Sequence, residues 1–178
     1  MLWWWIGSVV LVVVVASVIV FNELVAARNQ VRAAWSDIDV QLTRRHDLVP
    51  QLVAAVQGYA GYERATLTTL TELRTRALSA ATLADKAQVE GELAQQINRI
   101  LALQENYPDL KASENFLALQ RELVEIEDHL QYARRFYNGA VRDLNTKIET
   151  FPVLIIARLA AFKPAEFFRS GMDQGAPA

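Results

Sequence analysis

Apolar residues after position 22 recur every three or four residues, the spacing that places them on one face of an α-helix. The first such stripe runs from Leu24 to Tyr59, and we expect a single helix over this stretch. Its members are Leu24, Val31, Trp35, Ile38, Leu42, Val49, Leu52, Val56 and Tyr59. Because proline removes a backbone hydrogen bond, Pro50 is expected to kink this helix, and Gly58 and Gly61 are expected to end it.

Three further stripes predict three more long helices. The first covers about residues 62–79. The second opens at Thr82, which forms a capping-box pattern with Asp85, and it stops before Pro108, because the residue ahead of a proline avoids the helical region. The third is capped by Ser113 and continues to about residue 148. Together the stripes predict an all-α fold, an antiparallel bundle of about four long helices.

The first helix is preceded by a segment of different composition. Residues 2–21 carry no charge, and as a helix they would extend roughly 30 Å, the thickness of the hydrocarbon core of a bilayer. We therefore predict a transmembrane anchor over residues 1–21 that continues into a bundle over residues 22–168, with a flexible tail over residues 169–178. The membrane-anchor residues are Trp3, Trp4, Trp5 and Phe21, since aromatic rings favour the headgroup layer.

The alternative for this segment is a signal peptide cleaved after Ala27. It lacks the basic residues that begin a signal peptide, and its apolar run is longer than usual, so we favour the anchor. No basic residue precedes the span, whereas Arg28 and Arg32 follow it. By the positive-inside rule the bulk of the chain then faces the cytoplasm with the N-terminus outside, and the alternative is a periplasmic or extracellular bulk.

Composition narrows the possible functions. The chain has 178 residues, 21% of them charged, a net charge of −2 and no cysteine. No stretch of 18 residues after Phe21 is free of charge, which excludes a polytopic membrane protein. The near-neutral balance without a basic run argues against a nucleic-acid binder. The absence of cysteine excludes disulfides, thiolate metal sites and cysteine nucleophiles.

Motifs for metal binding or catalysis are missing, so we predict no enzymatic activity, no metal and no cofactor. The Glu-x-x-His pairs of di-iron bundles are absent, because Ile126 stands three residues before His129. Glu125 and His129 lie four apart and are interpreted as a solvated helical pair. The chain contains neither a Gly-x-Ser-x-Gly elbow nor a glycine-rich phosphate loop.

The densest group of charges is Arg44-Arg45-His46-Asp47. Consecutive helical residues point about 100° apart, so these four side chains cannot all face solvent. Arg45 falls near the apolar stripe and is expected to turn inward and to pair with a carboxylate of another helix. We favour this structural ion pair. The alternative is an anion or lipid-headgroup site formed by Arg44 and Arg45, with Arg28 and Arg32, because the guanidinium fork suits phosphate.

Two further groups of residues are candidates for interaction or for structure. They are Tyr107, Pro108, Asp109 and Lys111 in an expected loop over residues 105–111, and Tyr137 with Asn138 in the last long helix. Loops with prolines, aromatic rings and charges often carry function, but they also simply join helices. Most tyrosines on a stripe are core residues whose hydroxyl makes a hydrogen bond, and we expect this of Tyr137.

Three blocks of the chain resemble the LemA family in order. They are residues 21–60, 105–152 and 156–168, and their most specific motifs are Arg44-Arg45-x-Asp47-Leu48-x-Pro50 and Tyr107-Pro108-Asp109-Leu110-Lys111. The resemblance implies a bacterial inner-membrane protein with an amino-terminal anchor, a short segment outside the cell or in the periplasm, an antiparallel helical bundle and no settled catalytic activity. One departure is a conservative change: Ala161-Phe162 stands where the family has glycine-phenylalanine before Lys163-Pro164.

The leading hypothesis is a single-pass, membrane-anchored helical scaffold that binds protein partners or copies of itself beside the lipid bilayer. The arginine-based anion or lipid-headgroup binder is the alternative, and an enzyme or accessory subunit is a weaker third.

Overall fold

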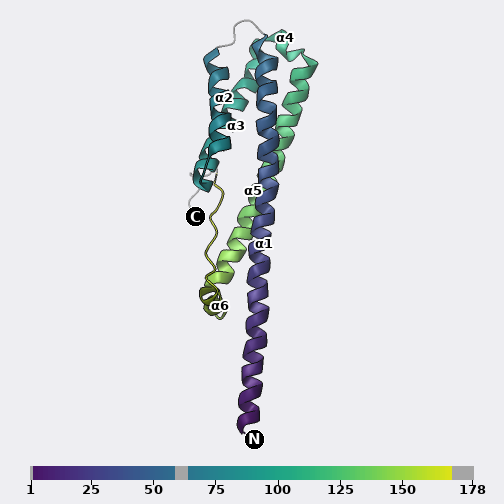
Figure 1. Ribbon diagram of the computed structural model, residues 1–178. Coiled ribbons are helices and arrows are strands. Elements are labelled where there is room, and N and C mark those ends of the chain that lie inside the picture. Colours follow the sequence, from purple (N-terminus) through teal and green to yellow (C-terminus); the bar gives the residue numbers. More distant parts are fainter. Residues whose placement is uncertain (1, 59–63, 170–178) are drawn as a thin grey trace. The chain divides into compact units, whose positions relative to one another are not determined.

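The computed structural model describes residues 2–58 and 64–169, and all regular elements of this part of the chain are helical (Figure 1). They are α1 (Leu2–Gln57), α2 (Arg64–Ser79), α3 (Leu83–Ala102), the 3₁₀ turn η1 (Leu103–Asn106), α4 (Pro108–Lys111), α5 (Glu114–Glu149) and α6 (Val153–Leu159). The predicted all-α class is therefore confirmed. The predicted tail after residue 169 lies outside the described residues.

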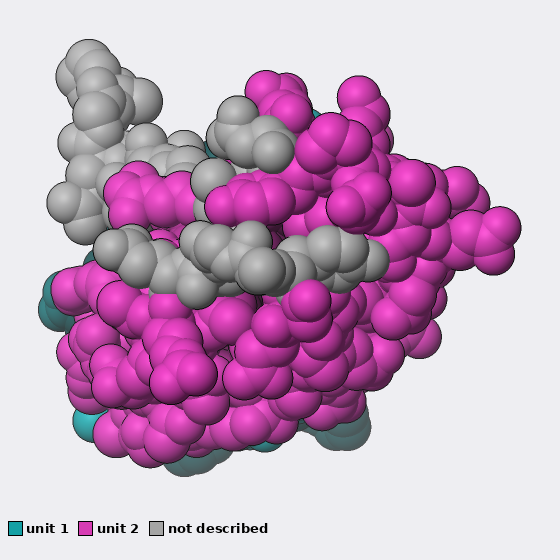
Figure 2. Space-filling model, turned by 90° about the horizontal axis from the view of Figure 1, so that it is seen from above, with its two compact units in different colours: residues 1–36, 135–167 teal, residues 37–134, 168–178 magenta. Residues whose placement is uncertain are grey.

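The chain divides into two compact units, coloured separately in Figure 2. Unit 1 combines Met1–Ser36 with Arg135–Phe167, and unit 2 combines Asp37–Arg134 with Phe168–Ala178. Two of the three boundaries between the units fall inside the long helices α1 and α5, so each unit contains a part of both helices, and the third lies between Phe167 and Phe168.

In unit 1, the first part of α1 changes character along its length. The side chains of residues 3–23 are exposed or half-buried, with Trp3, Trp4 and Trp5 exposed by 73–85%. From Leu24 onward one face of α1 is buried, and its partners come from the end of α5 and from α6. The buried residues are Leu24, Ala27, Val31 and Ala34 of α1, Tyr137, Ala140, Val141, Leu144 and Ile148 of α5, and Ala157 of α6.

In unit 2, the helices α2 and α3 form an antiparallel hairpin and pack with the adjoining parts of α1 and α5 (Figure 1). Each helix contributes apolar side chains from the stripe predicted for it. The buried residues include Ile38, Leu42, Leu52 and Val56 of α1, Leu67, Leu70 and Leu73 of α2, Leu93, Ile97 and Ile100 of α3, and Phe116, Leu119, Leu123, Ile126 and Leu130 of α5.

The helix ends follow the local sequence. The hydroxyl Oγ1 of Thr82 accepts a 3.0 Å hydrogen bond from the Asp85 amide, and Oγ of Ser113 accepts one of 3.4 Å from the Phe116 amide, so both predicted caps are confirmed. Helix α1 passes through the exposed Pro50 and ends at Gln57, with Gly58 in the following turn. Gly61, the other predicted terminator, lies outside the described residues.

The segment over residues 105–111 was expected to be a loop, and that expectation is wrong. It contains the end of η1 and the one-turn helix α4, which begins at Pro108. Proline favours the first position of a helix because its fixed φ is already helical and its missing amide has no partner there. Leu110 is fully buried and fastens this turn to unit 2.

Helix α6 is followed by a residue in the left-handed backbone conformation, Ala161. The Phe162 amide donates to the Ala157 carbonyl at 2.9 Å and the Ala161 amide donates to the Arg158 carbonyl at 3.2 Å, the two hydrogen bonds of a Schellman cap. This cap places Ala161 at φ 53°, where a side chain is unfavourable and glycine is the usual residue. The alanine that replaces the glycine of the LemA pattern is thus a strained substitution rather than a conservative one.

We predict that Ala161→Gly raises the free energy of unfolding by about 0.5–1 kcal/mol, because it removes the steric penalty of the left-handed backbone. Chemical denaturation of the full chain in detergent measures this difference. The control is Ala160→Gly at φ −89°, which should destabilise slightly. Equal effects of the two substitutions would contradict the strain.

Candidate functional site: the buried Arg45 cluster

Arg45 of α1 points into unit 2, where only 2% of it is exposed. One guanidinium nitrogen, Nη1, lies 3.5 Å from Oε2 of Glu90 on α3, and the other, Nη2, pairs with Glu127 on α5. The prediction that Arg45 turns inward and meets a carboxylate of another helix is therefore confirmed. The Arg45 side chain thus links α1 to both α3 and α5.

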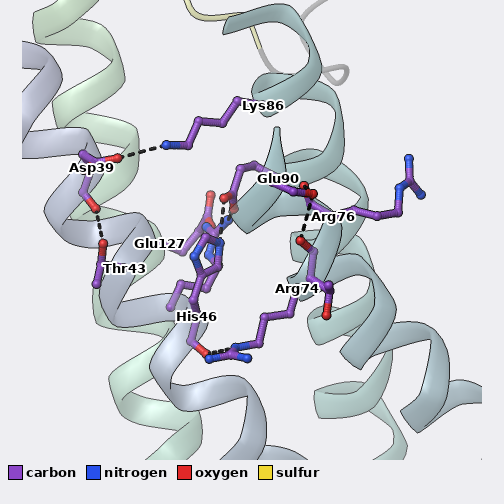
Figure 3. Close-up of polar contacts among 11 residues, drawn as sticks. Asp39, Thr43, His46, Arg74, Arg76, Lys86, Glu90 and Glu127 are labelled. Carbon is purple, nitrogen blue, oxygen red and sulfur yellow. Dashed lines mark hydrogen bonds and ion pairs between the residues drawn. The ribbon is translucent and has the colours of Figure 1, made fainter. Parts of the chain in front are cut away.

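His46, the next residue of α1, is also buried and shares Glu90 with Arg45 (Figure 3). Its Nε2 lies 2.7 Å from Oε1 of Glu90, so both oxygens of that fully buried carboxylate are engaged. The Nε of Arg74 on α2 donates a 2.7 Å hydrogen bond to the His46 carbonyl. This carbonyl is in the turn of α1 just before Pro50, which has no amide to donate to it.

The electrostatics of the cluster are a balance between burial and charge pairing. Burial lowers the pKa of Arg45 from its ordinary value, and the negative charges of Glu127 and Glu90 act in the opposite direction. Glu127 is shared, since Nη1 of Arg134 lies 3.9 Å from its Oε1. The guanidinium of Arg134 in turn lies 5.7 Å from the ring centre of Phe168.

This arrangement is suited to holding helices in register. A buried charge is costly unless it is paired and hydrogen-bonded, and here the carboxylate oxygens of Glu90 are already used by partners within the chain. Among residues 2–58 and 64–169, no group of three or more His, Asp or Glu side chains is placed to hold a metal ion. The geometry favours the structural interpretation of Arg45.

Arg44 lies apart from Arg45. It is exposed and lines a surface groove of unit 2 together with Asp47 and Leu48 of α1. The α5 side of the groove is lined by Glu122, Glu125, Ile126 and His129. Glu125 and His129 form the exposed helical pair expected from their spacing, with 3.6 Å between Oε1 and Nε2. The structure does not bring Arg44 and Arg45 to one site, as the anion-binding alternative requires.

The remaining candidates are spread over both units. Pro108, Asp109 and Lys111 are exposed in α4 of unit 2, and the half-buried Tyr107 caps that helix. Tyr137 is a core residue of unit 1, as predicted: its hydroxyl donates to the Glu166 carbonyl at 2.9 Å, and its ring meets Trp35 edge to face at 5.6 Å. Burial, with the nearby Glu166 charge, raises the pKa of Tyr137. Asn138 is half-buried.

Several structural partners were missed by the sequence reasoning. Glu90 and Glu127 were not selected, although Glu90 stands three residues before Leu93 and seven before Ile97, a charged residue on the apolar stripe of α3. A charged residue on an apolar stripe indicates a buried ion pair, so the position of Glu90 was the signal in the sequence. Asn145 was also missed, and its side-chain amide makes two hydrogen bonds with the main chain of Ala165, at 3.0 Å and 2.8 Å.

Comparison with known proteins identifies the family. A profile of the LemA family matches residues 34–177, which include both specific motifs and the whole of unit 2's polar cluster. The chain belongs to the LemA family. The protein LemA of Metamycoplasma hominis is 32% identical to this LemA family member over 162 residues, an alignment covering 85% of this chain and 73% of the relative.

Magnetosome proteins are more distant relatives of this LemA family member. Magnetosome protein MamQ 2 of Paramagnetospirillum magneticum is 25% identical over 84% of this chain, and magnetosome protein MamQ of Magnetospirillum gryphiswaldense is 22% identical over 83%. In both comparisons the alignment spans 64% of the length of the MamQ protein.

We predict that Arg45→Ala lowers the free energy of unfolding by about 3–5 kcal/mol, because it leaves Glu90 and Glu127 without their buried cation. The neighbouring Arg44→Ala, at an exposed position of the same helix, should change it by less than about 0.5 kcal/mol. Urea denaturation followed by circular dichroism measures both. Similar small losses for the two variants would contradict a structural role for Arg45.

Proposed function

We propose that this LemA family member is a single-pass membrane protein that holds a helical scaffold at the surface of the bilayer and binds other proteins or copies of itself there. The observation that carries the proposal is the first part of α1. Residues 2–21 are uncharged, and apart from the half-buried Ser17 and Val20 the side chains of residues 3–21 are exposed.

An apolar helix of this kind needs an apolar surrounding. Within the described residues, α1 alone is long and apolar enough to cross a membrane, judged by length and composition, and only 6% of its most apolar 18-residue window is buried. A core helix of a soluble protein would be mostly buried. Leaving this many valine, isoleucine and tryptophan side chains in water is unfavourable by about 1.5–3 kcal/mol for each large apolar side chain, which favours insertion into lipid.

The interaction part of the proposal is supported by the surface of unit 2. Its part of α5 exposes two large apolar side chains, Val124 by 52% and Tyr132 by 67%, and α1 exposes Val40 by 53%. Exposed apolar and aromatic residues on a rigid helix are typical of protein-binding surfaces. Cross-linking in intact membranes that yields only monomer would contradict self-association.

The scaffold proposal includes an orientation and the absence of catalysis. Arg28 and Arg32 follow the span closely, which supports a cytoplasmic bulk, with a periplasmic bulk as the other outcome. No acid, base and nucleophile occur as a recognisable set in the sequence, and the most buried carboxylate, Glu90, is engaged by Arg45 and His46. We propose a non-enzymatic role on these grounds.

The anchor is tested with charges placed inside and outside the span. We predict that Val12→Asp with Val13→Asp moves the protein from the membrane to the soluble fraction, because each aspartate at the centre of a span costs about 2.5–3.5 kcal/mol. The matched control, Asn29→Asp with Gln30→Asp, adds the same charge at exposed positions eight and more residues beyond the span and should stay membrane-bound.

Fractionation after alkaline carbonate treatment measures this distribution, and intact-mass analysis of the membrane-bound protein checks that residues 1–27 are retained. A reporter fused after Ala178 that is active only in the cytoplasm reads the orientation in the same strains. Cleavage after Ala27, or equal fractionation of the two variants, would contradict the anchor.

A further inference from the structure

The short helix α6 exposes an apolar face that the core of unit 1 does not use. Ile155 and Leu159 of α6 are four residues apart and are exposed by 52% and 83%, and Phe151, in the turn before α6, is exposed by 75%. Residues at this spacing lie on one face of a helix. The opposite face of α6 is packed against the unit, since Ala157 is fully buried.

The position of α6 along α1 is fixed by an aromatic contact. The ring of Phe162, just after α6, meets the ring of Phe21 edge to face with 6.1 Å between centroids, and the guanidinium of Arg28 lies 5.1 Å from the centre of the same Phe162 ring. Phe21 is the last residue of the uncharged segment, and Arg28 is the first basic residue after it. The end of α6 therefore lies where α1 passes from its apolar to its charged part.

This placement is held by several hydrogen bonds rather than by one contact. The chain after α6 is fastened to α5 by the Tyr137 hydroxyl, bonded to the Glu166 carbonyl, and by the Asn145 amide, bonded to the main chain of Ala165. In Figure 1, α6 lies beside α1 at the end of α5, and the purple beginning of α1 extends beyond it alone. The exposed face of α6 is thus held next to the candidate span.

The charged residues within residues 150–165 are both basic and suit an anionic surface. Arg158 and Lys163 are exposed on either side of Leu159 in the sequence. Lysine and arginine can place their apolar stems in the headgroup layer while their charged ends reach phosphate groups, and phenylalanine and leucine are typical of the apolar face of interfacial helices. A second copy of the chain would need a complementary apolar face at this height, whereas the bilayer that the proposed anchor crosses would lie beside α6 without any further partner.

We propose that α6 is an interfacial membrane contact. Phe151, Ile155 and Leu159 lie at the boundary between headgroups and acyl chains, and Arg158 and Lys163 meet lipid phosphates beside the span. This inference rests on the proposed anchor. It gives the protein two attachments to one leaflet, the span and the amphipathic α6, so that unit 1 is held in a fixed orientation against the bilayer.

The experiment uses the absence of cysteine in the chain. Single cysteines are introduced into the full-length protein by Leu159→Cys in α6, Val13→Cys in the span and Phe136→Cys in α5, and each is labelled with nitrobenzoxadiazole. Phe136 is the matched control, because it is a 54%-exposed aromatic residue of unit 1 roughly 20 Å along α5 from the end at Glu149. The proteins are reconstituted into phosphatidylcholine vesicles with and without phosphatidylglycerol.

The expected result is a blue-shifted emission at position 159 that nitroxide-labelled lipids quench, with red, unquenched emission at position 136. Quenching at position 13 with red, unquenched emission at position 159 would overturn the inference and leave the anchor in place. Blue-shifted emission at position 159 without quenching would also overturn it, because protein would then cover α6. Absence of quenching at position 13 would overturn the anchor and the inference with it.

Discussion

The proposed function depends on α1 meeting lipid over residues 2–21 and water beyond them with one continuous set of backbone hydrogen bonds. A helix satisfies its own amides and carbonyls in lipid and in water alike, so the change from residues 2–21 to the rest of α1 requires a change of side chains only. That change occurs between Phe21 and Leu24, where exposed apolar residues give way to a buried stripe. The chain belongs to the LemA family. The uncharged first part of α1 is the feature on which the proposed function rests.

Further along α1, the Arg45 cluster adds specificity to an otherwise repetitive core. Apolar stripes with three-and-four spacing can slide by a turn with little loss of burial, but a buried arginine that must meet Glu90 and Glu127 permits one register. Burial of the Arg45 guanidinium, which lowers its pKa, is an unfavourable contribution to folding that accompanies this single register. We interpret the cluster as a register device for α1, α3 and α5. Arg44 is not part of it because consecutive residues of a helix point about 100° apart, and its side chain is exposed.

The sequence predicted the long helices well, because their signals are local. The capping residues Thr82 and Ser113 predicted the starts of α3 and α5, and Gly58 predicted the end of α1. The position of Arg45 near the apolar stripe predicted that its side chain turns inward. The partners of Arg45 come from residues 45 and 82 positions away, and no local pattern pairs such distant charges. The strain at Ala161 was missed for a different reason: its left-handed backbone follows from the local cap of α6, but alanine is not the residue that signals such a cap.

The central claim is that α1 is one helix from the bilayer into water. Spin labels at Val13→Cys and Asn29→Cys, both exposed positions of unit 1, test it by pulsed dipolar spectroscopy in lipid nanodiscs. A continuous helix separates these backbone positions by about 24 Å, so we expect one narrow distance distribution near that value once the label arms are included. A broad or clearly shorter distribution would show a break in α1 between Val13 and Asn29 and would contradict a continuous helix.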